Sequence, residues 1–346
     1  MQLVAYGAQD IYLTGNPQIT FFKVVYRRHT NFAMESVAQT FDGQVKGGAA
    51  CDVSATISRN GDLVHRVYLE VDTAGLASDI NVAFGWVDHV ELEIGGQLID
   101  RHYGAWMQIW CELTHSDSKY AQLDELSQNG KTWIPLQFSF CRNPGLAVPL
   151  IALQYHEVKL NFRFTSSLPV DATVCLYCDY IYLDTDERRR FAQTSHEYLI
   201  EQVQADRSNL VQNGCVNKIA LTFNHPVKEL VWYQNAADKI SGAVLKLNGH
   251  ERFAKRHGHY FSKVQRYQHH TGATELTRNY VYSFALQPEE HQPSGTCNFS
   301  RIDNAVLELE FVTNGANAPG NCVDIYAVNY NVLRVMSGMG GLAYSN

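Results

Sequence analysis

The sequence has no apolar run long enough to cross a membrane. A spanning helix needs about 20 mainly apolar residues, and no stretch approaching that length occurs among the 346 residues. The first 25 residues contain Asp10, Asn16 and Pro17, and they show no basic segment leading into an apolar one, which is unlike a secretory signal peptide. The sequence therefore predicts neither a transmembrane segment nor a secretory leader.

An excess of positive charge is also missing. Only 18% of residues are charged, the formal net charge is −7 and the isoelectric point is about 6.0. The longest basic run, Arg188, Arg189 and Arg190, directly follows a group of acidic residues, so its charge is compensated locally. Because a basic surface supplies most of the affinity for nucleic acid, we expect no direct nucleic-acid contact.

The eight cysteines do not form a disulfide framework, because they are scattered along the whole chain. We interpret most of them as buried free thiols of a protein made in a reducing compartment. Cys175 and Cys178 have the spacing of a metal or redox pair. They fall in an alternating strand pattern, where residues three apart point to opposite faces, so we expect two structural thiols.

No catalytic motif is complete. Gly130-Lys131-Thr132 ends like a phosphate-binding loop, but Glu125 stands where the first glycine is required. The carboxylate pairs Asp184/Asp186 and Glu289/Glu290 lie in linker or turn composition, which is typical of solvated loops. A Gly-x-Ser-x-Gly nucleophile motif is absent. The sequence indicates no enzyme, and it implies no cofactor.

His257-Gly-His259 is the strongest indication of a metal site. Metal-binding jelly rolls use such a pair with a glutamate a few residues later and a further histidine. Here Lys263 and Val264 occupy the positions where the glutamate is expected. Since a catalytic metal needs three or four converging ligands, we predict no metal site.

What the sequence does contain is strict alternation of apolar and polar residues, which predicts strands with one buried face. It occurs at residues 65–72, 89–94, 158–164 and 307–311. Helical spacing is rare. Residues 106, 109, 110 and 113 (Trp, Ile, Trp, Leu) predict one short helix with a buried stripe. A second helix is predicted to start near Thr194, with Glu197 completing a capping box.

Five short similarities recur in the same order in the two halves of the chain, which predicts a duplicated β-domain. The pairs are His65-Arg-Val and His225-Pro-Val, Ile94-Gly-Gly and Leu247-Asn-Gly, Phe138-Ser-Phe and Tyr282-Ser-Phe, Val158-Lys-Leu-Asn-Phe and Leu307-Glu-Leu-Glu-Phe, and Ile181-Tyr and Ile325-Tyr. About eight strands per copy is the complement of a jelly roll.

The predicted fold class is therefore all-β, with two consecutive eight-stranded antiparallel jelly rolls and a few short helices. We divide the chain into an N-terminal arm (1–22), a first jelly roll (23–184), a linker with a short helix (185–212) and a second jelly roll (213–346). The first clear strand of the second jelly roll is placed at residues 218–223.

Long segments of the sequence resemble one known family over essentially the whole chain. They are residues 2–23, 24–32, 184–193, 196–202, 293–304 and 330–346, and they include Asp184-Thr-Asp-Glu-Arg-Arg-Arg-Phe-Ala-Gln. They look like the major capsid proteins of nucleocytoplasmic large DNA viruses, the family of the phycodnaviruses and iridoviruses. Two features depart from that pattern: Met1 stands where relatives often have a few more residues, and the chain is short, so outward loops must be reduced.

The resemblance implies a structural role in the virion capsid. It implies a homotrimer whose six jelly rolls form a pseudo-hexagonal capsomer. Neighbouring capsomers and minor capsid proteins would be its partners in an icosahedral shell over an internal membrane. It also implies synthesis and assembly in the host cytoplasm.

The candidate assembly contacts are aromatic and basic. Tyr6, Tyr12, Phe21 and Phe22 predict that the arm docks on a neighbouring protein, because such side chains need to be buried; packing on the chain's own jelly roll is the alternative. Two groups of arginines are candidates for inter-subunit ion pairs, and solvation at the surface is equally open: Arg27, Arg28, Arg188, Arg189 and Arg190.

One modification site and two other roles are also compatible with the sequence. Asn298-Phe-Ser300 is an N-glycosylation sequon, a weak three-residue signal. A lectin-like binding module is compatible with the fold, since fold does not fix function. A penton or minor capsid role is related, but pentons typically use a single jelly roll.

Overall fold

The computed structural model describes residues 7–73, 79–127, 130–212, 215–234, 240–272, 278–311 and 322–345. The chain separates into two compact units, Met1–Asn31 and Phe32–Asn346. The first unit contains one short helix, α1 (Asp10–Thr14), which buries no side chain. The second unit contains all the described strands.

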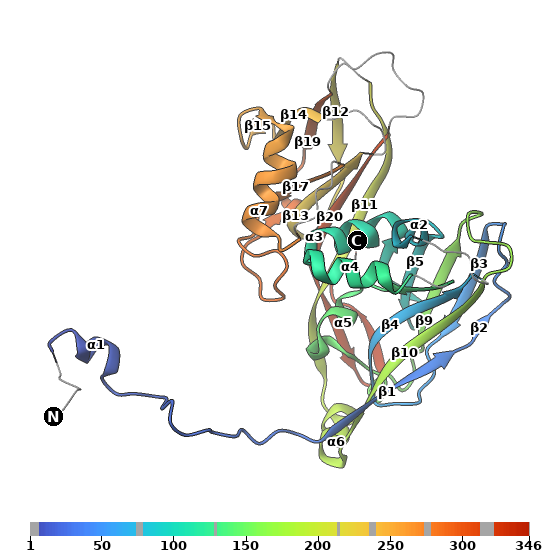
Figure 1. Cartoon of the computed structure of the whole chain (residues 1–346), viewed down its shortest axis with the longest axis vertical. Coiled ribbons are helices and arrows are strands. Elements are labelled where there is room, and N and C mark those ends of the chain that lie inside the picture. The colour runs from blue at the N-terminus through green and yellow to red at the C-terminus, as the bar shows by residue number, and fades with distance from the viewer. Residues whose placement is uncertain are drawn as a thin grey trace. The chain divides into compact units, whose positions relative to one another are not determined.

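Two sheets form the first barrel of the second unit (Figure 1). Sheet A has the order β1-β10-β4-β7, with β8 on β4, and sheet B has the order β2-β3-β9-β5-β6. Their bounds are β1 Phe32–Gln39, β10 Thr173–Leu183, β4 Leu63–Asp72, β7 Lys131–Pro135 and β8 Val148–Pro149, then β2 Phe41–Asp42, β3 Cys51–Thr56, β9 Val158–Phe164, β5 Val87–Ile94 and β6 Gln97–Tyr103.

Two further sheets form the second barrel. Sheet C has the order β11-β20-β13-β17, with β18 on β13 and β21 on β20, and sheet D has the order β12-β19-β14-β15, with β16 on β14. Their bounds are β11 His196–Leu210, β20 Cys322–Met336, β13 Pro226–Gln234, β17 Asn279–Ser283, β18 Cys297–Asn298 and β21 Met339–Leu342, then β12 Val216–Leu221, β19 Ala305–Phe311, β14 Ile240–Leu247, β15 His250–Glu251 and β16 Arg256–His257.

The two barrels have the same strand order. Sheet A corresponds strand by strand to sheet C, and the β3-β9-β5-β6 part of sheet B corresponds to β12-β19-β14-β15 of sheet D. Four of the five sequence similarities fall on corresponding strands or hairpin turns. The fifth does not, because Phe138 precedes helix α5 whereas Tyr282 lies within β17. The predicted duplicated jelly roll is confirmed.

Alternation explains both cores. In β9 and β19 every second side chain is buried, so one face of each strand lines its barrel interior. Matching turns close corresponding hairpins: Gly95 and Gly96 after β5, and Asn248 and Gly249 after β14, all have positive φ. This backbone suits the twist of a two-residue hairpin and favours glycine and asparagine.

The helices lie in the connections between strands. The predicted helix is confirmed as α3, and its four stripe residues are all buried. The described helical segments are α2 Ile80–Phe84, α3 Gly104–Thr114, α4 Asp117–Glu125, α5 Ser139–Arg142, η1 Pro144–Leu146, α6 Thr185–Gln193, η2 Tyr260–Val264 (a π-helical turn), α7 Gln265–His269 and η3 Phe299–Arg301.

The second predicted helix, starting near Thr194 with Glu197 as its capping residue, is wrong. Thr194 ends α6, and residues 196–210 form β11, the first strand of the second barrel. The strand predicted at 218–223 corresponds to β12 and comes second. The central residues of β11, 200–203, are all buried. Both faces of this strand are covered there, so the alternation that marks a strand is absent from its sequence.

Candidate assembly surfaces

The N-terminal arm exposes many large apolar side chains. Tyr12 is 91% exposed, Phe21 88% and Phe22 98%; Tyr6 lies outside the described residues. The other exposed apolar residues of this unit are Ile11, Leu13, Ile19, Val24, Val25 and Tyr26. Monomeric proteins rarely expose a large contiguous apolar patch, so this segment has the composition of a docking segment.

The predicted arginines fall into two classes. Arg188 pairs with Asp62 (Nε to Oδ1, 3.0 Å), and Arg190 lies 3.8 Å from Glu187 on the same helix. Arg27, Arg28 and Arg189 are exposed and make no ion pair with the part of the chain that the structure describes. Only these three are therefore available to pair with another molecule without first losing a partner.

Helix α3 of the first barrel packs on the outer face of sheet C (Figure 1). The Trp106 ring lies 5.2 Å from Tyr326 and 5.8 Å from Trp110, measured between ring centroids. The buried residues of this cluster come from α3, β11, β13, β17 and β20: Trp106, Ile109, Trp110, Leu113, Val203, Val231, Val281, Tyr326 and Val328. This apolar contact joins the two barrels.

A buried charge network lies beside the same contact. Glu201 on β11 forms ion pairs with Lys228 on β13 (2.8 Å) and with Arg142 on α5 (3.0 Å). Lys228 is fully buried, and the Arg142 guanidinium stacks over Trp110 at 4.3 Å. Burial alone would raise the pKa of Glu201, but the two cations hold it below its ordinary value. The carboxylate is therefore charged, and it ties three elements of two barrels together.

A second buried group surrounds His270. Its Nε2 lies 3.1 Å from Glu229 and its Nδ1 3.1 Å from Glu289. Burial opposes protonation, but the two carboxylates outweigh it and raise the pKa of His270 to about 9. Nearby, the amide of Asn279 donates to Glu112 of α3 (2.6 Å). His270 and its two carboxylates all belong to the second barrel, whereas the hydrogen bond from Asn279 to Glu112 links β17 to α3 of the first barrel.

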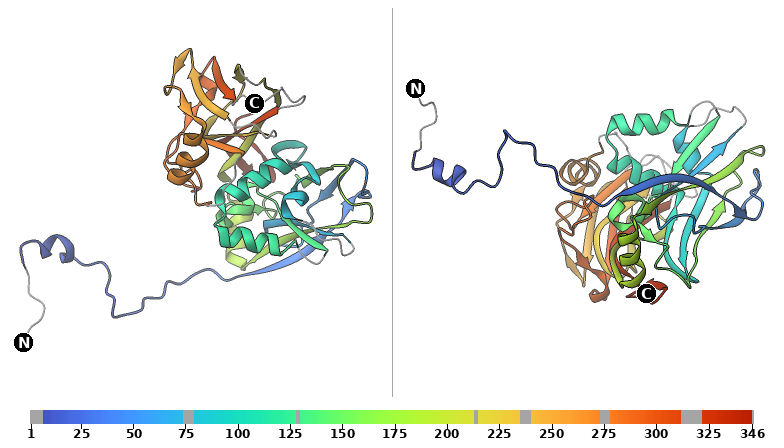
Figure 2. Two further views of the ribbon diagram at one scale, coloured as in Figure 1. Left: turned by 45° about the horizontal axis from the view of Figure 1, so that its top comes forward. Right: turned by 90° about the horizontal axis from the view of Figure 1, so that it is seen from below.

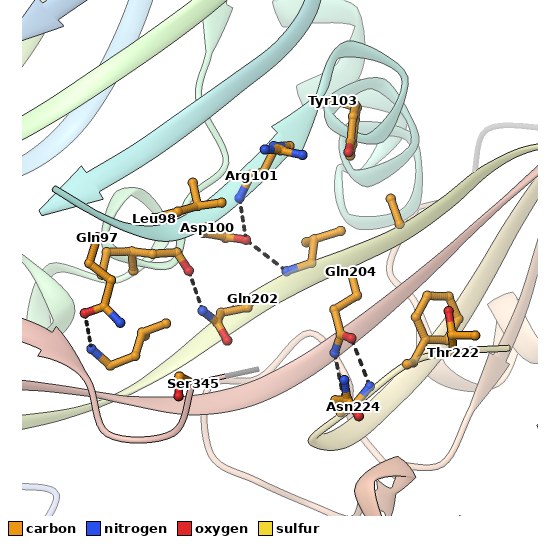
Figure 3. Close-up of a pocket in the computed structure, with 15 residues that line it drawn as sticks. Gln97, Leu98, Asp100, Arg101, Tyr103, Gln202, Gln204, Thr222, Asn224 and Ser345 are labelled. Carbon is orange, nitrogen blue, oxygen red and sulfur yellow. Dashed lines mark hydrogen bonds between the residues drawn. The ribbon is translucent and has the colours of Figure 1, made fainter. Parts of the chain in front are cut away.

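The cleft between β6 and β11 has a volume of about 510 Å³ (Figure 3). Gln202 donates to the carbonyl of Ile99, and the amide of Val203 donates to Asp100 (3.1 Å). Gln204 exchanges two hydrogen bonds with Asn224, of 2.7 and 2.9 Å. The bonds of Gln202 and Val203 join β11 to β6 and therefore link the two barrels, whereas those of Gln204 lie within the second barrel.

The candidate metal and thiol groups do not assemble into a site. The rings of His257 and His259 lie 4.7 Å apart, but no group of three or more potential ligands exists within the described ranges. Cys175 is exposed and Cys178 buried on the same strand, which confirms their predicted opposite orientation.

All eight cysteines are free, but the prediction that most are buried is wrong. Only Cys111, Cys141 and Cys178 are buried. Three others, at positions 51, 297 and 322, are the first residues of their strands. They lie where strands emerge from the barrels and are partly exposed.

Asn298 is exposed, and its Oδ1 accepts from the amide of Ser300 at 3.0 Å. Glycosylation there stays a prediction. Among the residues that the structure describes, no helix combines the length and apolar character needed to cross a membrane.

Solved structures define the class of fold. The Faustovirus major capsid protein matches with a TM-score of 0.74 over 96% of this chain and 94% of that chain, at 10% identity. The crystal structure of PBCV-1 VP54 matches with a TM-score of 0.87 and 39% identity, over 94% of this chain and 100% of that chain. The protein is thus a double jelly roll of the viral capsid type.

Sequence comparisons then give the family. Residues 20–184 match the model of the major capsid protein N-terminus, and residues 187–239 and 233–341 match the large eukaryotic DNA virus major capsid protein model. The major capsid protein of Pyramimonas orientalis virus is 52% identical and that of Paramecium bursaria Chlorella virus 1 is 42% identical, each over 100% of this chain and 99% of the relative. The chain belongs to the major capsid proteins of large eukaryotic DNA viruses.

The protein is a structural component of the virion capsid and not an enzyme, as the sequence indicates.

The relatives are longer than this chain. The alignments with them run over 404 and 434 positions, against 346 residues in this chain. The relatives therefore carry insertions that this chain lacks.

Proposed function

We propose that three copies of this protein form a pseudo-hexagonal capsomer, and that capsomers tile an icosahedral shell over an internal membrane. The observation that carries the proposal is the repetition of one strand order in two barrels of one chain. Three such chains around a threefold axis present six similar barrels, which is the shape that packs hexagonally. A chain of the PBCV-1 virus capsid model matches this fold with a TM-score of 0.85, which supports the role.

The solution mass of the purified protein tests the trimer. Light scattering should give a stable species of three times 39.1 kDa, and electron microscopy should then show hexagonal particles. A monomer at micromolar concentration would contradict the capsomer.

The arm, residues 1–22, is proposed to lie along the base of the capsomer and to dock on neighbouring protein. Its exposed Tyr12, Phe21 and Phe22 support this. Deleting residues 2–16 should leave trimers intact and reduce the yield of tiled assemblies. Normal tiling of the deletion variant would show that the arm has no such role.

Exposed arginines are proposed to add inter-subunit ion pairs, and Arg27, Arg28 and Arg189 are the preferred members of the predicted set. Changing each to glutamate should lower shell yield. Arg188→Glu is a poor test of assembly, because it also removes the 3.0 Å pair with Asp62 inside the chain. We also propose that the protein is made and assembled into capsids in the host cytoplasm.

A further inference from the structure

Corresponding faces of the two barrels are covered differently. The outer face of sheet C lies under α3. Sheet A has the same strand order. We align the two sheets on Leu69 and Leu230, two core residues of corresponding strands: Leu69 pairs with Ile134 and Leu176, and Leu230 pairs with Tyr282 and Ala327. On the outward side, three positions of sheet A therefore match three residues of the junction: Trp133 matches Val281, Tyr177 matches Val328 and Cys175 matches Tyr326.

The outer face of sheet A carries an aromatic cluster that no helix of the described residues buries in the way that α3 buries sheet C. The rings of Tyr68, Trp133 and Tyr177 lie 5.1 to 6.0 Å apart, and all three side chains are partly exposed. Met34 on the adjoining strand β1 is 50% exposed, and Cys175 is exposed. We call this surface, Met34, Tyr68, Trp133, Cys175 and Tyr177, the open face.

The second barrel has its own counterpart of α3. Helix α3 connects β6 to β7, and the segment η2-α7 makes the corresponding connection from β16 to β17. This helical segment, drawn in orange, lies at the side of the second barrel (Figure 2). Phe261 is buried in the core of that barrel, as Met107 of α3 is in the core of the first.

Aligning Phe261 with Met107 gives the counterpart of the α3 stripe. Trp106, Trp110 and Leu113 then correspond to Tyr260, Val264 and Tyr267. The three α3 residues are buried against sheet C. In contrast, Val264 is 40% and Tyr267 is 90% exposed. Tyr260 is partly exposed, and it also packs against the core of its own barrel. We call Tyr260, Val264 and Tyr267 the exposed stripe.

The charged residues around the two surfaces differ in sign. Residues 252–269, which contain the exposed stripe, include five Arg or Lys and no Asp or Glu; of these, Lys255 pairs with Glu310 and Arg266 is buried within the chain. Glu70 and Asp179 lie close enough to Tyr68 of the open face to raise its pKa, after burial as the larger cause, and Glu70 pairs with Lys131 of the same sheet at 3.1 Å. Charge therefore adds little to the match, which rests on the apolar side chains.

We propose that the exposed stripe of one copy packs on the open face of the next copy, repeating between copies the contact that α3 makes with sheet C within the chain. The contact is heterologous, and repeating it closes a ring when each step turns by a third of a circle, as in the proposed trimer. This inference rests on the proposed trimer and identifies the two surfaces that hold it together. It also explains why this helix carries apolar side chains on its solvent side.

The first test is the double variant Val264→Asp, Tyr267→Asp. Both positions are exposed in the single chain, so the barrels should still fold. Two charges at the centre of an interface should weaken trimer formation by on the order of tenfold or more. The matched control is Val170→Asp, because Val170 is 74% exposed and lies outside both surfaces.

The second test is a cross-link between cysteines. Within the chain, the ring centroids of Trp106 and Tyr326 lie 5.2 Å apart, and the corresponding pair between copies is Tyr260 with the native Cys175. Two large rings in contact hold their backbones farther apart than a disulfide spans, so the variant Tyr260→Cys should be joined to Cys175 of the next copy by a short bis-maleimide linker, seen as a ladder on a denaturing gel. Adding Cys175→Ser should abolish the ladder, whereas adding Cys215→Ser should not, although Cys215 is also exposed.

The outcomes separate the two proposals. A monomeric wild-type protein overturns the trimer itself. A wild-type trimer that persists in the double aspartate variant and gives no Cys175-dependent ladder overturns the interface alone. A wild-type trimer lost in the double variant, with a ladder that depends on Cys175, supports both.

Discussion

The barrel junction and the N-terminal arm distribute their side chains in opposite ways. The junction buries charge, with Lys228 and Glu229 fully excluded from solvent. The arm exposes aromatics, with Phe22 98% accessible. Buried charges are satisfied by partners within the same chain, whereas exposed aromatic residues gain free energy only when another surface covers them. The junction therefore stabilises the fold of one copy, whereas the arm has the character of a surface that joins copies.

The largest effect should come from breaking the junction's charge network. Glu201→Ala leaves Lys228 and Arg142 without their carboxylate in a buried site. Removing one member of a buried pair costs about 3–5 kcal/mol, because the remaining charge is uncompensated. Urea unfolding followed by tryptophan fluorescence should report the loss, since Trp110 lies against Arg142.

A control on the same strand sharpens this prediction. Glu197 on β11 pairs with Arg334 at 2.8 Å, but both side chains are about half exposed. Glu197→Ala should cost at most about 1 kcal/mol, as is usual for surface pairs. Equal losses in the free energy of unfolding for the two variants would mean that the buried pair at the junction stabilises the protein no more than a surface pair does.

A smaller, pH-dependent effect should come from His270. Its folded-state pKa is raised from 6.5 to about 9, so the stability gained from its protonation is fully present below about pH 6.5 and is lost as the pH rises through 9. The melting temperature of the wild type should therefore fall towards that of His270→Gln across this window. A gap between the two proteins that stays constant from pH 6 to pH 10 would contradict the assignment.

The sequence predicted most of the fold because a strand with one buried face alternates apolar and polar residues, as β9 does. Strand β11 was not predicted, because its residues 200–203 are buried on both sides and do not alternate. The second side is covered by another barrel, and such long-range cover leaves no local signal. With no alternation to indicate a strand, the capping-box pattern of Thr194 and Glu197 was interpreted as the start of a helix in the linker.

The assembly surfaces were less predictable for the same reason. The aromatic arm and the arginines could be named from composition, but nothing local marks Arg188 as already paired with Asp62. Tyr68, Trp133 and Tyr177 come from three separate strands and meet only in the folded sheet. The significance of Tyr267 depends on a comparison with α3 in the other barrel, which needs the topology of both.

The smallest effect on a single copy should come from removing the arm. None of its described side chains is buried, so deleting residues 2–16 should change the stability of the barrels by no more than about 0.5 kcal/mol, as surface changes usually do. The same deletion is expected to lower shell yield, so stability and assembly should separate in this variant and fall together in Glu201→Ala. A deletion that lowers the melting temperature of isolated trimers by several degrees would show that the arm packs on its own capsomer and stabilises it, as the junction does.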